Sequence, residues 1–125
     1  MFARTHAHAH AHAHYTLYNH NNLCRYAGVS EGDVVLDPMC GVGTIPIEGA
    51  TGFPWAIFLG GEKDQESLDI ATTNLSHARK SCVSLCELIH WDATDTNLRS
   101  SSVDTIICDM PWGQRSGSQV VNIPH

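Results

Sequence analysis

From residue 30 onward, short apolar runs alternate along the chain with segments that have a helical pattern. The runs have the length of buried parallel strands and cover residues 34–37, 55–59, 87–91 and 103–108. Helical patterns cover residues 44–52 and 65–80, and a weaker one lies within residues 15–28 and ends near Gly28. The alternation predicts an α/β fold with an open, mainly parallel sheet of about four strands and flanking helices.

The helical segments are marked by their spacing and by the residues at their ends. Thr44 is expected to cap the first helix, with Pro46 in the first turn and Gly52 near the end. The second helix has apolar residues at steps of three and four on one face: Leu68, Ala71, Leu75 and Ala78. The connection over residues 93–102 is too polar to assign to a helix or a strand.

Each predicted strand ends at, or is followed by, an acidic residue: Asp37, Glu62, Asp92 and Asp109. In doubly wound sheets, ligands bind beyond the carboxyl ends of the strands. A single aspartate after a strand usually forms a turn or caps a helix, but here all four strands share the feature. We therefore expect the four carboxylates to converge on one binding site.

A loop with two glycines follows the first predicted strand. Gly41 and Gly43 lack a Cβ atom, so the main chain there is able to approach a nucleoside closely and to offer it N–H groups. The pattern G-x-G-x-x-P has no third glycine, which disfavours a pyrophosphate site and a nicotinamide-dependent dehydrogenase. Glu62 follows Asp37 by 25 residues and is placed to accept hydrogen bonds from a ribose diol. Asp92 is placed to contact an adenine amino group.

The segment Asp109-Met110-Pro111-Trp112-Gly113 follows the last predicted strand. Pro111 fixes the turn and biases the residue before it toward an extended conformation. This geometry is expected to hold the Asp109 carboxylate and the Trp112 ring on one side of the same pocket. A planar amine needs an acceptor for its N–H and a flat surface for stacking. The plainer interpretation is a Pro-Trp turn that fills the core.

Two segments together resemble the S-adenosylmethionine-dependent methyltransferases of the THUMP-domain group: DPMCGVGTIPIEGA (37–50) and DMPWGQR (109–115). The resemblance covers roughly residues 23–118. Those enzymes methylate the exocyclic N2 of guanine in tRNA, and the bacterial 23S rRNA guanine-N2 methyltransferases are more distant relatives. The resemblance implies the N-terminal part of a Rossmann-like class I methyltransferase sheet. It also implies S-adenosyl-L-methionine as the cofactor. The start of the sequence, MFARTHAHAH, has no apolar core of a secretory signal, which predicts a cytoplasmic or nuclear protein.

The resemblance also assigns roles to single residues. The cofactor-binding residues that it implies are Asp37, Met39, Cys40, Gly41, Gly43, Glu62 and Asp92. The residues implied for the acceptor motif, of the (Asp/Asn)-Pro-Pro-aromatic type, are Asp109, Pro111 and Trp112. The group's usual Asp-Leu-Pro-Phe reads Asp-Met-Pro-Trp here, a change that preserves volume and stacking. Asp109 is expected to orient N2 and ease the loss of its proton, while Trp112 stacks on a flipped guanine.

Composition limits the class of protein and its partners. The chain has 125 residues, 42% hydrophobic and 16% charged, which fits one small globular domain. Seven Lys and Arg against thirteen Asp and Glu give a net charge of −6, so the chain is a poor binder of nucleic-acid phosphates by itself. The longest near-apolar stretch, residues 53–61, is too short to cross a membrane.

Cysteine and histidine usage predicts no metal site. Five cysteines without a C-x-x-C pair are typical of reduced thiols in a cytosolic or nuclear protein. A zinc site could be assembled from His77, Cys82, Cys86 and His90, but their spacing matches no common zinc motif. Residues 1–14 include the run HAHAHAHAH and are expected to form a disordered low-complexity leader, although alternate histidines could bind a transition metal weakly.

The family pattern is longer than this sequence. Residues 15–118 are expected to form a partial methyltransferase domain and residues 119–125 a disordered tail, so the truncated sheet should leave the edge of residues 105–108 open. We expect tRNA to be bound through a THUMP domain that the sequence lacks, and some relatives need a small activator subunit. Two alternatives stay open. One is a non-catalytic fragment or cofactor-binding remnant, and the other is a methyltransferase of another planar amine, either adenine or a glutamine side chain.

Overall fold

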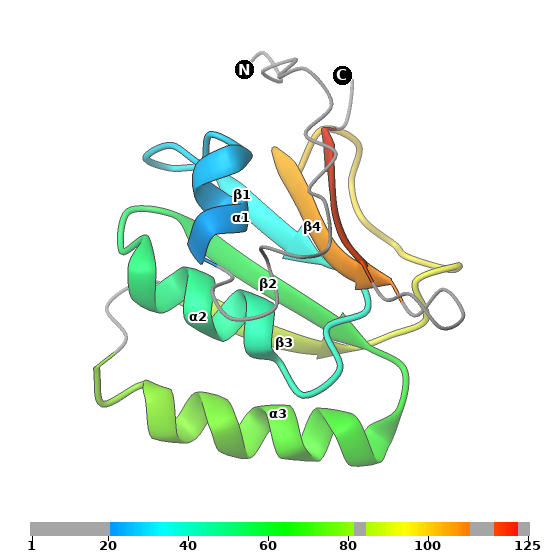
Figure 1. The fold of residues 1–125 in the computed structure, drawn as a ribbon. Coiled ribbons are helices and arrows are strands. Elements are labelled where there is room, and N and C mark those ends of the chain that lie inside the picture. The colour runs from blue at the N-terminus through cyan, green and yellow to red at the C-terminus, as the bar shows by residue number, and fades with distance from the viewer. Residues whose placement is uncertain (1–20, 82–84, 111–116, 123–125) are drawn as a thin grey trace.

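The computed structural model describes residues 21–81, 85–110 and 117–122, which form one sheet and three helices (Figure 1). The strands are β1 (Val34–Asp37), β2 (Ile57–Glu62), β3 (Leu85–His90), β4 (Thr105–Met110) and β5 (Gly117–Asn122). They lie in the order β3-β2-β1-β4-β5. β1 pairs in parallel with β2 and β4, and β2 pairs in parallel with β3. The predicted α/β fold with four parallel strands is therefore confirmed.

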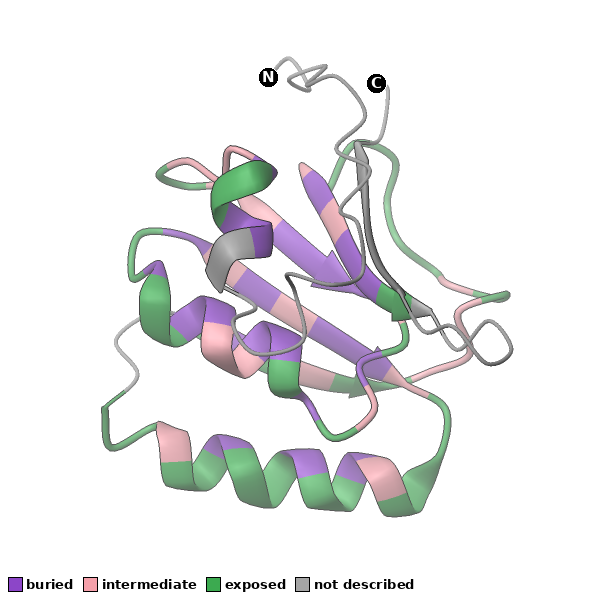
Figure 2. Ribbon diagram, viewed as in Figure 1, coloured by how far each residue is buried: buried purple, intermediate pink, exposed green. Residues whose placement is uncertain are grey.

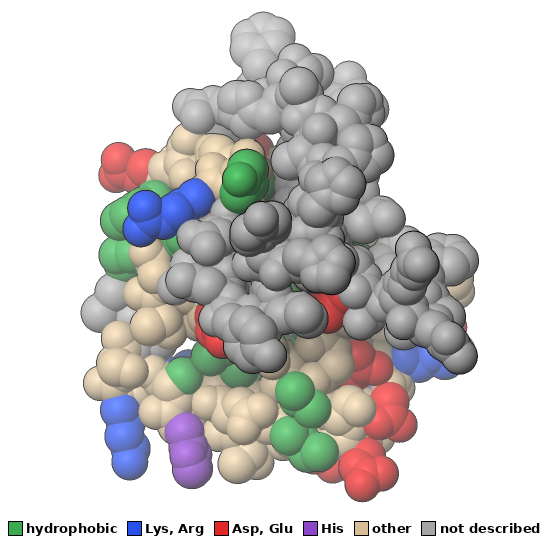
Figure 3. All heavy atoms as spheres, viewed as in Figure 1, with side chains coloured by type: hydrophobic (Ala, Val, Ile, Leu, Met, Phe, Trp, Pro, Cys, Tyr) green, Lys and Arg blue, Asp and Glu red, His purple; other side chains and the backbone are tan. Residues whose placement is uncertain are grey.

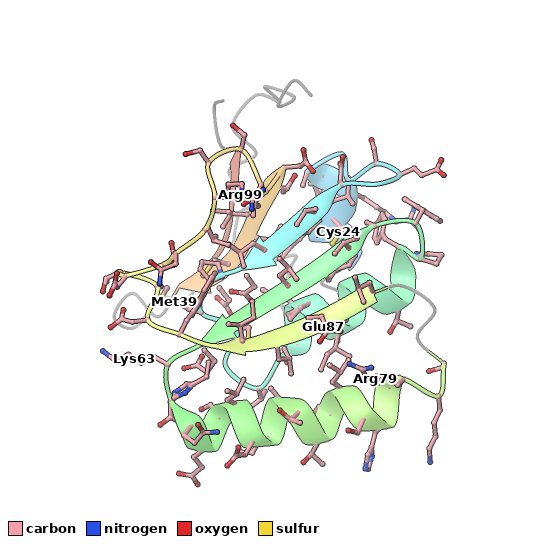
Figure 4. All side chains as sticks on the ribbon, turned by 180° about the vertical axis from the view of Figure 1, so that it is seen from behind. Cys24, Met39, Lys63, Arg79, Glu87 and Arg99 are labelled. Atoms are coloured by element: carbon pink, nitrogen blue, oxygen red, sulfur yellow. The ribbon has the colours of Figure 1, made fainter. Side chains whose placement is uncertain are left out.

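The helices are α1 (Asn21–Tyr26), α2 (Thr44–Gly52) and α3 (Gln65–Ala78). Seen from behind, the parallel strands lie in front of α1 and α2 (Figure 4). Asp64 caps α3, because its side chain accepts a hydrogen bond from the Ser67 main-chain N–H at 2.9 Å. Acidic side chains gather where α3 begins, and His77 lies in its last turn (Figure 3). Acidic groups at the first turn and a basic side chain at the last turn both interact favourably with the dipole of the helix.

The core lies between the helices and the sheet. Each parallel strand contributes one buried side chain to it: Val35, Phe58, Cys86 and Ile107. The helices contribute Leu23, Cys24, Ile45, Ala50 and Leu75. Figure 2 shows this burial running along the middle of the strands and the inner side of α2. No helix of the described residues is long and apolar enough to span a bilayer.

The elements differ from the sequence predictions mainly at their ends. Thr44 is not the cap of α2; that position belongs to Gly43, whose φ of 86° only glycine adopts readily. β2 runs on to Glu62 instead of ending at residue 59, because Gly60 and Gly61 pair with neighbouring strands. β4 extends to Met110, so Asp109 lies within the strand and not beyond it.

The prediction of an open edge beside residues 105–108 is wrong. The backbone of Gly117–Asn122 forms β5, which pairs antiparallel with β4 along its whole length. The prediction of a disordered tail therefore fails for residues 119–122. A ladder of main-chain hydrogen bonds satisfies the N–H and C=O groups that β4 would otherwise present at an edge. The sequence GSQVVN includes two adjacent valines, whose β-branched side chains favour an extended backbone.

Gly49 of α2 lies against the ring of Phe58, and Gly49→Ala is expected to lower the free energy of unfolding by about 1–3 kcal/mol. A Cβ atom at residue 49 would stand 2.3 Å from Phe58 Cε1, and this ring is fully buried. The clash should outweigh the better helix propensity of alanine. Urea denaturation measures the change. Thr51→Ala, on an exposed position of the same helix, is the control, and equal stabilities of the two variants would contradict the prediction.

Candidate functional site

Three of the four predicted carboxylates meet at the carboxyl ends of the parallel strands. Asp37 ends β1, Glu62 ends β2, and Asp109 is the next-to-last residue of β4. The Asp37 side chain is only 3% exposed, and this burial raises its pKa to about 7. Hydrogen bonds from the Met39 main-chain N–H and from the Cys108 thiol lower the pKa, while the charges of Asp109 and Glu62 raise it. The charges of Glu62 and Asp109 therefore act on the Asp37 carboxyl group.

Glu62 joins the loop after β1 to the start of α3. Its Oε2 atom accepts a hydrogen bond from the Gly41 main-chain N–H at 2.7 Å, and its Oε1 atom accepts one from the Asp64 N–H at 2.9 Å. Hydrogen bonds to an ionised carboxylate are among the stronger ones in proteins. Each carboxylate oxygen has a second lone pair. The side chain thus organises the loop and retains acceptor capacity for a ligand hydroxyl.

The main chain of this loop is held by the protein itself. The Met39 N–H donates to Asp37 Oδ1 at 3.1 Å, and the Cys40 N–H donates to the Gly61 carbonyl at 2.8 Å. Together with the Gly41 bond, this leaves fewer N–H groups for a ligand than the sequence suggested. What the loop offers is close approach, because Gly41 has a φ of 55° and a Cβ atom there would meet nothing within 4 Å.

Met39 and Cys40 have opposite surroundings. The Met39 side chain is 38% exposed at the carboxyl ends of the strands, the same end as Lys63 (Figure 4). Cys40 is buried, with its sulfur against the main chain of Gly60. Burial raises the pKa of the Cys40 thiol to about 12, so the thiol is neutral at pH 7 and is no nucleophile. Cys40 therefore anchors the loop in the structure, and Met39 is the more accessible of the two.

Asp92 lies two residues beyond β3 and is fixed by hydrogen bonds from its neighbours. Its Oδ1 atom accepts from the Thr94 main-chain N–H at 2.9 Å and from the Thr94 hydroxyl at 2.6 Å. Its Oδ2 atom is 2.9 Å from the Lys63 ammonium nitrogen. The hydrogen bonds from Thr94, and then that from Lys63, hold the pKa of Asp92 well below its usual range. Lys63, which follows β2 directly, connects Asp92 to the end of that strand.

The acceptor motif is only partly described. Asp109 is exposed within β4, where its partner in β5 is Ser118. Pro111 and Trp112 lie outside the described residues, so their placement beside Asp109 stays a prediction.

Three further residues belong to this region although no sequence motif indicated them. Lys63 binds Asp92, the Cys108 thiol binds Asp37, and the indole N–H of Trp91 donates to the Pro38 carbonyl at 3.0 Å. Each stands next to one of the predicted acids in the sequence, which is the one signal that could have found them. Among the described residues, no group of three or more His, Cys, Asp or Glu side chains could hold a metal ion, and Cys82 lies outside them.

Residues 20–123 match the family described as RMKL-like, methyltransferase domain. The chain belongs to this family. The methyltransferase domain is 37% identical to tRNA (guanine(6)-N(2))-methyltransferase THUMP3 of Mus musculus over 99 residues, which are 72% of this chain and 20% of that protein. It is 38% identical to U6 snRNA (guanine-N(2))-methyltransferase THUMPD2 of Mus musculus over 89 residues, which are 71% of this chain and 16% of that protein. The chain thus spans about a fifth of the length of such relatives.

Solved structures share the fold of this methyltransferase domain. An RNA methyltransferase from Salinibacter ruber, in complex with S-adenosyl-L-homocysteine, aligns with a TM-score of 0.61 and 19% sequence identity. The alignment covers 84% of this chain and 90% of that one. The Rossmann-like methyltransferase sheet that the sequence predicted is therefore confirmed.

Proposed function

We propose that this methyltransferase domain binds S-adenosyl-L-methionine beside the loop after β1 and transfers its methyl group to the exocyclic N2 of a guanosine in RNA. The observation that carries the proposal is the junction of Asp37, Gly41 and Glu62, where two carboxylates flank a main chain with open space beside it. The relatives named above support the reaction, since both are guanine-N2 methyltransferases of RNA. The THUMP3 likeness favours tRNA as the substrate, and the THUMPD2 likeness makes U6 snRNA the second candidate.

The residues present fit the chemistry of this cofactor. A buried carboxylate such as Asp37 suits the cationic methionine end, and the unused lone pairs of Glu62 suit the ribose hydroxyls. Asp92 keeps its charge and one acceptor position on Oδ2 for an adenine amino group. Met39, Cys40 and Gly43 complete the proposed site through the shape of the loop. When bound, S-adenosyl-L-methionine supplies an electrophilic methyl group on a positively charged sulfur.

The chain's own residues are proposed to bind the base and move a proton. Asp109 would accept a hydrogen bond from the guanine amino group and so turn the N2 lone pair toward the methyl group that the cofactor supplies. As the new N–C bond forms and the C–S bond breaks, N2 loses a proton and the Asp109 carboxylate is placed to accept it. Pro111 and Trp112 are proposed to hold the flipped base, with stacking worth about 1–3 kcal/mol.

The RNA partner is proposed to be gripped mainly by other parts of a longer protein. A net charge of −6 is unfavourable for phosphate binding, and the relatives are about five times longer than their match to this chain. Residues 15–118 are accordingly proposed as one part of a methyltransferase domain. A small activator subunit and a cytoplasmic or nuclear location stay part of the same proposal.

Titration calorimetry with S-adenosyl-L-homocysteine tests the cofactor site. The 125-residue chain should bind it, and transfer of a labelled methyl group should then be measured on unmodified tRNA and U6 snRNA transcripts. Methylation at guanine N2 supports the proposal. A chain that gives no heat with the cofactor contradicts it and favours a non-catalytic fragment, while a methyl group found on adenine or on a glutamine side chain assigns a different acceptor.

Glu62→Ala is expected to weaken cofactor binding by about 10- to 100-fold, because it removes the acceptor for the ribose and releases the Gly41 and Asp64 N–H groups. The same calorimetric titration measures the loss. Glu66→Ala, an exposed acid in the first turn of α3, is the matched control and should stay within about twofold of wild type. Equal affinities of the two variants would remove Glu62 from the proposed site.

A further inference from the structure

Trp91 connects the ends of three strands at the candidate site. It follows β3 directly, and its main-chain N–H donates to the Glu62 carbonyl at 3.1 Å, at the end of β2. Its indole N–H donates to the Pro38 carbonyl at 3.0 Å, just after β1. The side chain is half-buried and is not part of the hydrophobic core cluster. A role in filling the core therefore does not account for its position.

Gly61 makes room for the indole ring. A Cβ atom at residue 61 would stand 1.7 Å from Trp91 Nε1 and 1.9 Å from Cε2, so the ring lies directly on the Gly61 main chain. Gly61 is not among the glycines with positive φ, so its backbone conformation does not require glycine. Glycine is required at this position because the indole ring occupies the space of a side chain. The Gly61 carbonyl also accepts the Cys40 N–H, which places the ring next to the anchor of the loop.

The indole bond acts on a part of the loop that has few other ties. Pro38 has no N–H group, so its carbonyl is the only hydrogen-bonding group through which its main chain is held. On either side of it, Asp37 carries the buried carboxylate and Met39 donates to that carboxylate. A shift of the Pro38 carbonyl would therefore change the direction of the Asp37 carboxylate and the path of the chain toward Gly41.

We propose that Trp91 is a positioning residue, whose indole N–H latches the loop after β1 in the shape that binds the cofactor. This inference rests on the proposed function. It assigns Trp91 no contact with the reacting atoms; the residue acts through Pro38 on Asp37 and through Gly61 on the Cys40 anchor. Gly61 and Trp91 act as a pair, because any side chain at residue 61 would overlap the indole ring.

Trp91→Phe tests the latch, because it keeps a ring on Gly61 and removes only the N–H donor. Hydrogen–deuterium exchange of the amides of residues 39–43 and calorimetric titration with S-adenosyl-L-homocysteine are the two measurements. We expect exchange in this loop to become about 3- to 10-fold faster and the dissociation constant to rise by a similar factor. Exchange in α3 and β4 and the melting temperature should stay close to wild type, which a merely structural role of Trp91 would not predict.

Trp55→Phe is the matched control, since Trp55 is 49% exposed, precedes β2 and packs edge-on against Phe53 at the other end of the sheet. If Trp91→Phe behaves like this control in both measurements, the latch is overturned. Unchanged loop exchange overturns it even where the wild-type chain binds no cofactor. A wild-type chain without affinity contradicts the proposed function instead, and with it the claim that the latch serves a cofactor.

A double-mutant cycle of Gly61 and Trp91 gives a second, independent test. Gly61→Ala should push the ring aside and speed exchange at Cys40, because the added methyl group takes the position of the ring. In the background of Trp91→Ala the same change should cost little, so the two effects should be strongly non-additive. Additive effects would show that the ring and Gly61 do not act as a unit and would overturn the proposal.

Discussion

Asp37→Asn is expected to raise the free energy of unfolding by about 2–4 kcal/mol above pH 7 while weakening cofactor binding. Burial raises the pKa of Asp37 from 3.8 to about 7, so between these values the folded chain binds a proton that the unfolded chain has lost. The wild-type chain therefore loses stability as the pH rises through this window, by about 1.4 kcal/mol for each tenfold fall in proton concentration. Asparagine does not titrate, and its side-chain oxygen still accepts the Met39 N–H.

The difference between variant and wild type isolates this one group. It should be near zero below about pH 4, where Asp37 is protonated in both states, and should reach its full size above about pH 7. Urea denaturation across this range of pH measures it, with Asp69→Asn on the exposed side of α3 as the control. A constant difference at all pH values would mean that Asp37 does not titrate in this range.

Cofactor binding should show the opposite dependence on pH. A cationic ligand favours the ionised form of Asp37, so the affinity of the wild-type chain should rise as the pH passes through about 7 and then level off. Binding at pH 7 should release protons, which calorimetry in buffers of different ionisation enthalpy detects. In Asp37→Asn the affinity should lose this dependence and fall about 10- to 100-fold at about pH 8. The ionised Asp37 carboxylate therefore lowers the stability of the free chain and strengthens the binding of the cationic cofactor.

The sequence predicted the four parallel strands better than the antiparallel edge strand β5. β1, β2 and β4 each lie between two neighbouring strands and are short apolar runs. β3, at the other edge, has the buried Cys86 and the half-buried Leu88 among exposed residues. β5 pairs only with β4, and the mostly polar run of Gly117–Asn122 has no comparable signal. The cap of α2 was equally hidden, since nothing in the pattern showed that Gly43, and not Thr44, is the residue that precedes the helix.

The position of the candidate site could be predicted from the sequence, but the contacts between its residues could not. The acids could be assigned to strand ends from spacing alone, but the burial of Asp37 depends on β4 lying beside β1, with Cys108 next to its carboxylate. That neighbourhood joins residues that are far apart in the sequence. The Lys63–Asp92 pair and the Trp91–Pro38 bond likewise cross between strands. Local patterns carry no information on which distant side chains meet, so these contacts could be found only from the folded chain.

Asp109→Ala is expected to lower methyl transfer by about 10²–10⁴-fold while cofactor affinity stays within about threefold of wild type. Asp109 is exposed at the end of β4, so its removal leaves no unsatisfied buried group and should not disturb the fold. Single-turnover transfer to an unmodified tRNA transcript, at saturating cofactor, measures the chemical step. Asp95→Ala, an exposed acid in the loop after β3, is the control and should transfer at the wild-type rate.

The pH dependence of cofactor binding in Asp109→Ala shows whether Asp109 belongs to the site. The charge of Asp109 raises the pKa of Asp37, so its removal should move the pH midpoint of cofactor binding downward. If the pH midpoint of binding falls and methyl transfer is lost, Asp109 lies between the charge of the cofactor and the acceptor amine. If cofactor affinity falls as steeply as transfer, Asp109 supports the structure of the site instead. An unchanged midpoint would show that the two carboxylates do not share a pocket, and the assignment of Asp109 as the proton acceptor would then be wrong.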